Sequence, residues 1–450
     1  MITGPLGSVR LGTGPLGTGP VHRWTALEPR PTWVIAWVLG WVLGGLQIAA
    51  AAESPRWESR GKGHEDHPLL PALLRRAEES LRDALQRLPQ ELGFAPDVTR
   101  IRWVLDVSPH VSTLRKGAWK KENEQEQEQA QDEEQEQEQE KEKENEKETE
   151  KEPFEAGRTC FAEPVVEVVI PARRFLRHPD EVKPVVLHEA AHAALASRLR
   201  TRERYLGVPS WFREGIALAF SGEGELRLEE RIADTVFRGA EAGSFLVGVP
   251  ASKVPEKTVP GEEAWLAVVW IETQAGKDGV RRLCAEAARG RPLEECIEGL
   301  LGKPRELISA AMLLHARRRV EELLPPRRER VFRDSLARHD VDGAMEAWRA
   351  LLVEDAEGPL AGTLHYLLGR EYARQPGPEG RREARRHLEG LLSTRTALWR
   401  PEALVLLGEC LRADGKEPEA RALWEEVLEA YGEDEIPAAR ARKGLEAPAR

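Results

Sequence analysis

Cysteine is scarce in this chain, which has only four among 450 residues, and no two of them form a C-x-x-C pair. This spacing argues against a structural zinc finger. Cys284 and Cys296 can bridge neighbouring helices if the compartment is oxidising. Buried free thiols are an equally good interpretation of the same two residues.

A surplus of positive charge is also missing. The formal net charge is −11, and residues 121–152 hold 16 acidic and 5 basic side chains, an excess of 11 negative charges. The rest of the chain is therefore neutral. Without a net-basic domain or interleaved aromatic and basic residues, nothing supports nucleic acid as a partner. Residues 121–152 cannot bury apolar area, so we expect a disordered acidic insertion there.

Long apolar runs are absent apart from one, residues 33–52. Arg23 and Arg30 precede this run, which ends in four alanines, the small-residue pattern of a signal-peptidase site. The run is also long enough to span a bilayer. We therefore predict for residues 1–52 either a signal peptide cleaved near Ala52 or an uncleaved membrane anchor. Both alternatives export the rest to the periplasm or another extracytoplasmic compartment, with membrane contact only through this segment.

One stretch that is present carries a complete chemistry: residues 184–196 read PVVLHEAAHAALA. Pro184 suits the first turn of a helix, and the alanines and leucines favour its continuation. Positions i and i+4 share a helix face, so His188 and His192 can point at one metal ion. Glu189 lies beside the first ligand, where a general base can act on a water. A helix that is apolar nearly all round is expected to be buried, where two histidines need partners.

A catalytic zinc site takes three protein ligands and keeps one position open. The arrangement H-x-x-G-x-x-H would need a histidine where Arg198 stands, so it is excluded. Further on the chain reads P-S-W-F-R-E-G-I-A, in which Ser210 suits the N-cap of a second helix and Glu214 falls within its first turns. Glu214 is therefore a candidate for the third ligand, and Glu203 and Glu223 are weaker candidates.

H-E-A-A-H followed by W-F-R-E-G-I-A resembles the gluzincin zinc peptidases, in particular the peptidase MA-like family of bacterial exported proteins. The resemblance covers about half of the chain. It implies that His188, His192 and Glu214 hold Zn²⁺ and that Glu189 is the catalytic base. It also implies an α+β fold with a small, mostly antiparallel sheet and zinc-binding helices, and a peptide or protein as substrate.

Hydrophobic patterns predict the elements around this motif. Apolar spacing indicates an amphipathic helix over residues 69–92, and alternation indicates a strand over residues 99–107. Residues 163–170 are predicted to form the next strand. In gluzincins the strand before the zinc helix lies at the sheet edge and pairs with the backbone of the bound peptide. The resemblance gives that role to residues 163–170. Further helices are predicted over residues 227–245 and 264–274 and within 279–307.

Peptide hydrolysis also needs a hydrogen-bond donor or a cation for the oxyanion that develops. Tyr205, the only tyrosine of the predicted catalytic region, and His315 are the candidates. A purely structural role is the alternative for both residues, and geometry decides between the two.

From Arg327 onward the pattern changes to pairs of helices. Leu407, Gly408 and Trp424 match the spacing of a tetratricopeptide repeat, and residues 368–369 repeat the Leu-Gly pair that begins it. One interpretation is a concave surface that binds a peptide or protein partner. The other is a helical stack that supports the peptidase domain.

The sequence thus predicts an exported zinc-dependent metallopeptidase with an all-α, TPR-like domain at its C-terminal end. The rival hypothesis is a catalytically silent envelope scaffold, in which the peptidase fold is structural and the repeats bind protein partners. Intact ligands and an intact Glu189 favour the enzyme, since a scaffold has no physical need for the base. The expected parts are the signal peptide or anchor over 1–52, a linker over 53–68, the peptidase domain over 69–325 with its insertion at 121–152, and the repeats over 326–450.

Overall fold

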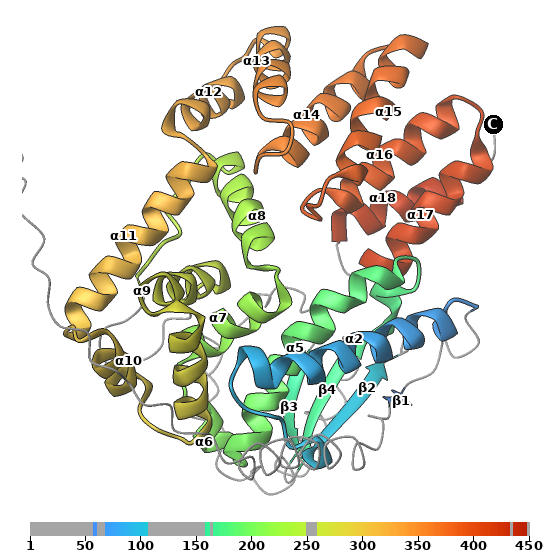
Figure 1. The fold of residues 1–450 in the computed structure, drawn as a ribbon. Helices are drawn as coiled ribbons and strands as arrows, with labels where there is room; N and C mark the ends of the chain where they lie inside the picture. The colour runs from blue at the N-terminus through green and yellow to red at the C-terminus, as the bar shows by residue number, and fades with distance from the viewer. Residues whose placement is uncertain are drawn as a thin grey trace, which may run out of the picture. The chain divides into compact units, whose positions relative to one another are not determined.

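The computed structural model describes residues 57–60, 68–106, 158–162, 165–248, 259–432 and 435–447. The predicted signal peptide or anchor and the predicted acidic insertion lie outside these residues. Residues from Pro55 to Arg450 form one unit. The described part is mostly helical with one small sheet, which agrees with the α+β class (Figure 1). None of its helices combines the length and the apolar character that crossing a membrane requires.

The sheet has four strands in the order β1-β2-β4-β3. β2 and β4 confirm the strands predicted over residues 99–107 and 163–170. In β4 Val166, Val168 and Ile170 are buried and alternate with half-buried residues, and Pro171 at the end of the strand is buried too. The strands are β1 (Trp57–Arg60), β2 (Ile101–Asp106), β3 (Arg158–Ala162) and β4 (Val165–Pro171).

Two expectations about the sheet are wrong. β1 pairs with β2 and β2 with β4 in parallel, and only β3 and β4 are antiparallel, so the described sheet is mixed rather than mostly antiparallel. A parallel pair needs a long crossover, which helix α2 (Leu70–Glu91) supplies between β1 and β2. β4 lies inside the sheet between β2 and β3 rather than at its edge, because β2 pairs with one side of it and β3 with the other.

Strand β1 lies within residues 53–68, which were expected to be a linker. Its four residues alternate too briefly to predict a strand. The pairing is nevertheless continuous, from Trp57 opposite Trp103 to Arg60 opposite Asp106. The indole rings of Trp57 and Trp103 also pack against each other, with centroids 5.4 Å apart. The strand conformation of β1 therefore depends on contacts with residues that are distant in the sequence.

Helix α5 (Val182–Leu199) contains the histidine motif and confirms the helix predicted there. It packs against β4, against α2 and against helix α7 (Ser210–Ser221), as Figure 1 shows beside the sheet. Helix α2 confirms the amphipathic helix predicted over residues 69–92, since its apolar side chains at helical spacing are buried. The motif is thus held between the sheet and two helices.

Two short helices and three longer ones follow the motif in order. The longest, α9, consists of two helical stretches that meet at Gly276, where φ is 70°, a conformation that glycine adopts without strain. The helices are α6 (Arg202–Leu206), α8 (Gly224–Phe237), α9 (Gly261–Ala288), α10 (Leu293–Leu301) and α11 (Arg305–Leu323).

The C-terminal residues form successive helices, each packed on the next, which confirms the helices predicted from Arg327 onward. Both Leu-Gly pairs mark close approaches. A Cβ on Gly408 would lie 2.4 Å from Nε1 of Trp424, and one on Gly369 would lie 2.8 Å from the side chain of Leu388. The helices are α12 (Pro326–Leu336), α13 (Val341–Glu354), α14 (Ala361–Arg374), α15 (Pro378–Ser393), α16 (Arg400–Ala413), α17 (Glu417–Tyr431) and α18 (Glu435–Glu446).

One hydrophobic core continues across residue 326, where we expected the repeat domain to begin. It joins Leu228 of α8 and Leu266 of α9 to Phe332 of α12 and Trp348 of α13. The C-terminal helices therefore pack on the helices that follow the motif through buried apolar side chains.

Polar contacts join α16 and α17 to the segment that leads into α5. The Arg177 guanidinium pairs with the Glu429 carboxylate at 2.5 Å, and Arg400 pairs with Glu181 at 3.2 Å. His178 lies between Glu426 and Arg400, with its Nε2 atom 3.1 Å from the former and 3.2 Å from the latter. The C-terminal helices thus contact the residues immediately before the histidine motif.

Candidate metal centre

The functional side chains of α5 lie in a buried setting. His188, Glu189 and His192 are 8 %, 5 % and 7 % exposed. The alanines around them are small enough for neighbouring elements to pack closely against the helix. Burial of one carboxyl and two imidazoles is costly unless partners compensate for the lost water. The surroundings of these groups therefore decide what the site can do.

Three potential ligands converge as the sequence predicts. The Nε2 atoms of His188 and His192, one helical turn apart, are separated by 3.1 Å. Glu214 on α7 faces both rings, with one carboxylate oxygen 3.4 Å from Nε2 of His192 and the other 3.6 Å from Nε2 of His188. This group can hold a metal ion.

The glycine after Glu214 explains how α7 reaches this position. A Cβ on Gly215 would lie 2.4 Å from the carbonyl oxygen of Ala264 and 2.7 Å from the side chain of Val268. Only glycine lets α7 approach α9 so closely. The helix begins at Ser210 with Pro209 in the N-cap position, so the expected N-cap is displaced by one residue.

The charges of the group are mutually stabilising. Burial acts to raise the pKa of Glu214, but the two histidines outweigh it and hold the pKa well below its usual range. Burial acts to lower the pKa of His192, but Glu214 outweighs it, helped by Glu189, and the net shift is upward. The site thus favours a positive charge between an ionised carboxylate and the imidazoles, which is the environment a cation requires.

Glu189 has a partner from the sheet. The Thr159 hydroxyl, on β3, donates a hydrogen bond of 2.6 Å to its Oε2 atom. Because β3 is an edge strand of the described sheet, this bond joins the sheet edge to the residue expected to act as base. Thr159 thus holds one oxygen of the Glu189 carboxylate.

Tyr205 lies against the far side of His192. Its hydroxyl is 3.1 Å from the Nδ1 atom, whereas the ring nitrogen that faces His188 and Glu214 is Nε2. The guanidinium of Arg213, the residue before Glu214, lies 4.5 Å from the centre of the Tyr205 ring. Burial raises the pKa of Tyr205 to about 12, although Arg213 acts in the opposite direction. The phenol is therefore neutral at physiological pH.

The structure does not bring the other candidates to this group. His315 lies on α11, and the charged groups that act on its pKa are Glu322, Arg318 and Arg319, all on the same helix. Glu223 pairs with Arg227 at 3.5 Å. Glu203 is exposed on α6. Within the described residues, the group of potential ligands in reach of one ion includes none of the three.

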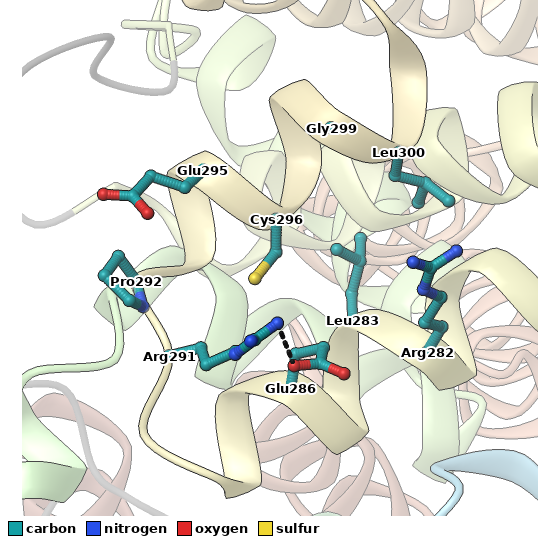
Figure 2. Close-up of a pocket in the computed structure, with 9 residues that line it drawn as sticks. All are labelled: Arg282, Leu283, Glu286, Arg291, Pro292, Glu295, Cys296, Gly299 and Leu300. Atoms are coloured by element: carbon teal, nitrogen blue, oxygen red, sulfur yellow. Dashed lines mark ion pairs between the residues drawn. The ribbon is translucent and has the colours of Figure 1, made fainter.

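A separate pocket lies between α9 and α10, and Figure 2 shows that Cys296 points into it. Its volume is about 400 Å³. Glu286 and Arg291 form an ion pair of 3.1 Å in its wall. None of the residues that converge at the histidine motif lines this pocket. Cys284 is buried close by, and neither cysteine forms a disulfide in the part of the chain that the structure describes.

Sequence reasoning missed Thr159 and Arg213. Thr159 belongs to a short strand with no clear alternation, and a contact 30 residues along the chain leaves no trace in local pattern. Arg213 lies inside the motif that was recognised from the sequence. Its contact with the Tyr205 ring became apparent only in the fold. A basic residue beside a predicted ligand was the one available signal.

No protein-family model, curated protein or solved structure matches this chain. The residues that the fold brings together therefore carry the functional interpretation by themselves. Two buried histidines, His188 and His192, and the half-buried Glu214 form a group able to hold a metal ion.

Proposed function

We propose that the protein is an exported zinc-dependent metallopeptidase of the gluzincin type, with a C-terminal TPR-like domain. The observation that carries this proposal is the convergence of two imidazole nitrogens and one carboxylate on a single point, with Glu189 beside them. A scaffold requires neither this convergence nor a buried glutamate at that position.

The distances suit zinc. Zinc bonds to imidazole nitrogen and carboxylate oxygen are roughly 2.0–2.2 Å long, so two ligands of a tetrahedral site lie roughly 3.3–3.6 Å apart. The corresponding separations among His188, His192 and Glu214 are 3.1, 3.4 and 3.6 Å. Two histidines and one carboxylate also leave the fourth position open, as in catalytic zinc sites.

Glu189 is the proposed base. When bound, zinc supplies Lewis acidity, which lowers the pKa of a water and polarises a peptide carbonyl. Glu189 is close enough to His192 to act on the pKa of that ring. With Oε2 held by Thr159, its other oxygen accepts the proton of the attacking water and later delivers it to the leaving amine.

The substrate backbone is proposed to pair with β3. The resemblance to gluzincins gave this role to an edge strand, and β3 rather than β4 occupies an edge of the described sheet. Thr159 on β3 bonds Glu189, so a peptide added beside β3 would lie next to the base.

The test compares Glu189→Gln with the parent protein. The substrate is fluorescently labelled casein, an unstructured protein. The parent should hydrolyse it, lose activity to a zinc chelator and recover it with added zinc. Glu189→Gln should keep about one zinc per chain and lose roughly 10²- to 10⁴-fold of the rate. Glu203→Gln, an exposed glutamate on α6, is the control and should match the parent.

Hydrolysis retained by Glu189→Gln would contradict the assignment of the base. A parent protein that holds zinc but cleaves no casein would point to one narrow substrate. No zinc and no hydrolysis, after attempted reconstitution, would support the envelope scaffold with protein-binding repeats instead.

A further inference from the structure

We propose that Tyr205 is a positioning residue, whose hydroxyl fixes the tautomer and ring orientation of His192 so that Nε2 is presented to the metal. This inference rests on the proposed zinc site. In this inference Tyr205 acts through the ligand His192. The sequence had suggested instead that Tyr205 contacts the substrate oxyanion directly.

The first observation is where the hydroxyl lies. It is 3.1 Å from Nδ1 of His192, the ring nitrogen opposite the one that faces His188 and Glu214. A histidine that binds a metal through Nε2 carries its proton on Nδ1, and that N–H needs an acceptor. The Tyr205 oxygen is the acceptor at the right distance.

The second observation is that Tyr205 is itself held in place. It is only 8 % exposed, and the Arg213 guanidinium packs 4.5 Å from the centre of its ring. The Nε atom of Arg213 donates in turn to the carbonyl of Val208 at 3.0 Å. The short helix that carries Tyr205 is capped by Thr201, whose hydroxyl accepts from the Arg204 amide. The hydroxyl therefore has little freedom to turn away from His192.

The third observation is an asymmetry between the two histidines. The Nδ1 atom of His188 is buried and has no hydrogen-bond partner among the described residues. His192 is thus the imidazole whose orientation a second side chain controls. Removing the partner would leave a buried N–H unsatisfied at the site, which is more costly than the loss of an ordinary hydrogen bond.

The chemistry of the phenol suits this role. A phenol hydroxyl has a lone pair that can accept from Nδ1–H, and it adds no charge to the site. An oxyanion stabiliser would have to direct the same hydroxyl toward the substrate. The position beside Nδ1 supports positioning of the ligand instead.

The test measures zinc affinity by competition with a chromophoric chelator, using the full-length protein. Tyr205→Phe keeps the ring and removes only the hydroxyl, so it should bind zinc about 10- to 100-fold more weakly than the parent. The matched control is Tyr366→Phe, since Tyr366 is also 8 % exposed but stacks on Trp399 in the C-terminal helices. This control should bind zinc like the parent.

Thermal melting of the metal-free proteins checks that Tyr205→Phe is folded at the temperature of the titration. If it is not, Arg213→Met provides a second variant, because it loosens the Tyr205 ring and keeps the hydroxyl. This variant should weaken zinc binding by a few-fold, and unchanged affinity would contradict the proposal.

Equal zinc affinity in parent, Tyr205→Phe and Tyr366→Phe would overturn the inference and leave the zinc site intact. A reduced hydrolysis rate at full zinc occupancy with equal affinity would likewise overturn it, in favour of the oxyanion role. A parent protein that binds no zinc would overturn the proposed function together with this inference, so the two failures are distinguishable.

Discussion

The described part of the chain contains two pairs of neighbouring histidines with nearly the same spacing. On α5, the Nε2 atoms of His188 and His192 are 3.1 Å apart. In the C-terminal helices, the Nδ1 atoms of His365 on α14 and His387 on α15 are 3.2 Å apart. Spacing alone would make both pairs candidate metal ligands.

Their neighbours differ in the sign of charge. The first pair faces the carboxylate of Glu214, which raises the pKa of His192 against the effect of burial. The second faces Arg386, whose guanidinium lies 3.1 Å from Nε2 of His387. Burial, together with Arg386, lowers the pKa of His387 to about 4. The surroundings of the first pair favour a positive charge, whereas those of the second pair disfavour one.

The comparison teaches that a third ligand, and not the distance between imidazoles, separates a metal centre from a buried polar contact. Within the residues that the structure describes, His188, His192 and Glu214 are the group of three with ligand atoms in reach of one ion. His365 and His387 instead satisfy each other inside a helix interface, where Tyr372 stacks on the His387 ring.

Glu214→Gln should have the largest effect, because it removes the carboxylate beside His188 and His192. The first pair would then lack an anionic third ligand, as the second pair does. We expect zinc affinity to fall by at least about 100-fold, since changes outside the ligand shell already cost 10- to 100-fold. Glu383→Gln, near His387, is the matched control and should leave zinc affinity unchanged. Competition with a chelator measures both, and tight zinc binding by Glu214→Gln would contradict the assigned third ligand.

Gly215→Ala, beside the first pair, should lower the free energy of unfolding more than Gly369→Ala, in the C-terminal helices, does. The new Cβ would meet a backbone carbonyl at 2.4 Å in the first case and the flexible Leu388 side chain at 2.8 Å in the second. Overpacking costs about 1–3 kcal/mol, and we expect the upper end for Gly215→Ala and the lower end for Gly369→Ala. Urea unfolding of both variants measures this difference, and equal costs would show that α7 can shift away from α9.

The histidine pair in the C-terminal helices should make stability depend on pH. The pKa of His387 is about 4 in the folded protein, below the value of about 6.5 for an unfolded histidine. The unfolded chain therefore takes up the proton first, and stability should decrease as pH falls from about 6.5 to about 4. The pKa of His365 is lowered in the same direction by burial and Arg386. The charged and titratable groups that act on His387 are Arg386, His365, Glu383 and Arg349.

His387→Asn tests this dependence, because the amide keeps a hydrogen-bonding group near His365 but does not titrate. We expect the parent to lose about 1–3 kcal/mol more than the variant between pH 7 and pH 4, measured by urea unfolding of the zinc-loaded proteins. Parallel pH profiles for the two proteins would mean that His387 takes no part.

Thr159→Val should have the smallest effect. It removes the hydroxyl that holds Oε2 of Glu189 and keeps the shape of the side chain. We expect a loss of kcat of about tenfold, roughly the 1.4 kcal/mol that one hydrogen bond to a charged group is worth, with zinc affinity unchanged. Thr159→Ser restores the hydroxyl and should recover most of the rate. Failure of this rescue would show that the effect is structural.

The candidate metal centre was predictable because its potential ligands lie in two short local motifs. The i, i+4 spacing of His188 and His192 requires only a helix, and Glu214 follows in a recognisable segment. The convergence of the three on one point needed the fold, in particular the close packing of α7 on α9 at Gly215.

The sheet was harder to predict because its pairings are long-range. β1 and β3 are short and gain their strand conformation from β2 and β4, so the sequence around them shows little alternation. The parallel pairing, the edge position of β3 and the bond from Thr159 to Glu189 all follow from that arrangement. The pair of His365 and His387 also could not be predicted from the sequence, since it joins two helices through side chains 22 residues apart.

The most direct test of the account is the zinc content of the purified protein, measured beside His192→Ala and His387→Ala. We predict about one zinc per chain in the parent and in His387→Ala, and none in His192→Ala. Equal zinc in all three, or none in the parent after reconstitution, would contradict the assignment of His188, His192 and Glu214 as the metal centre.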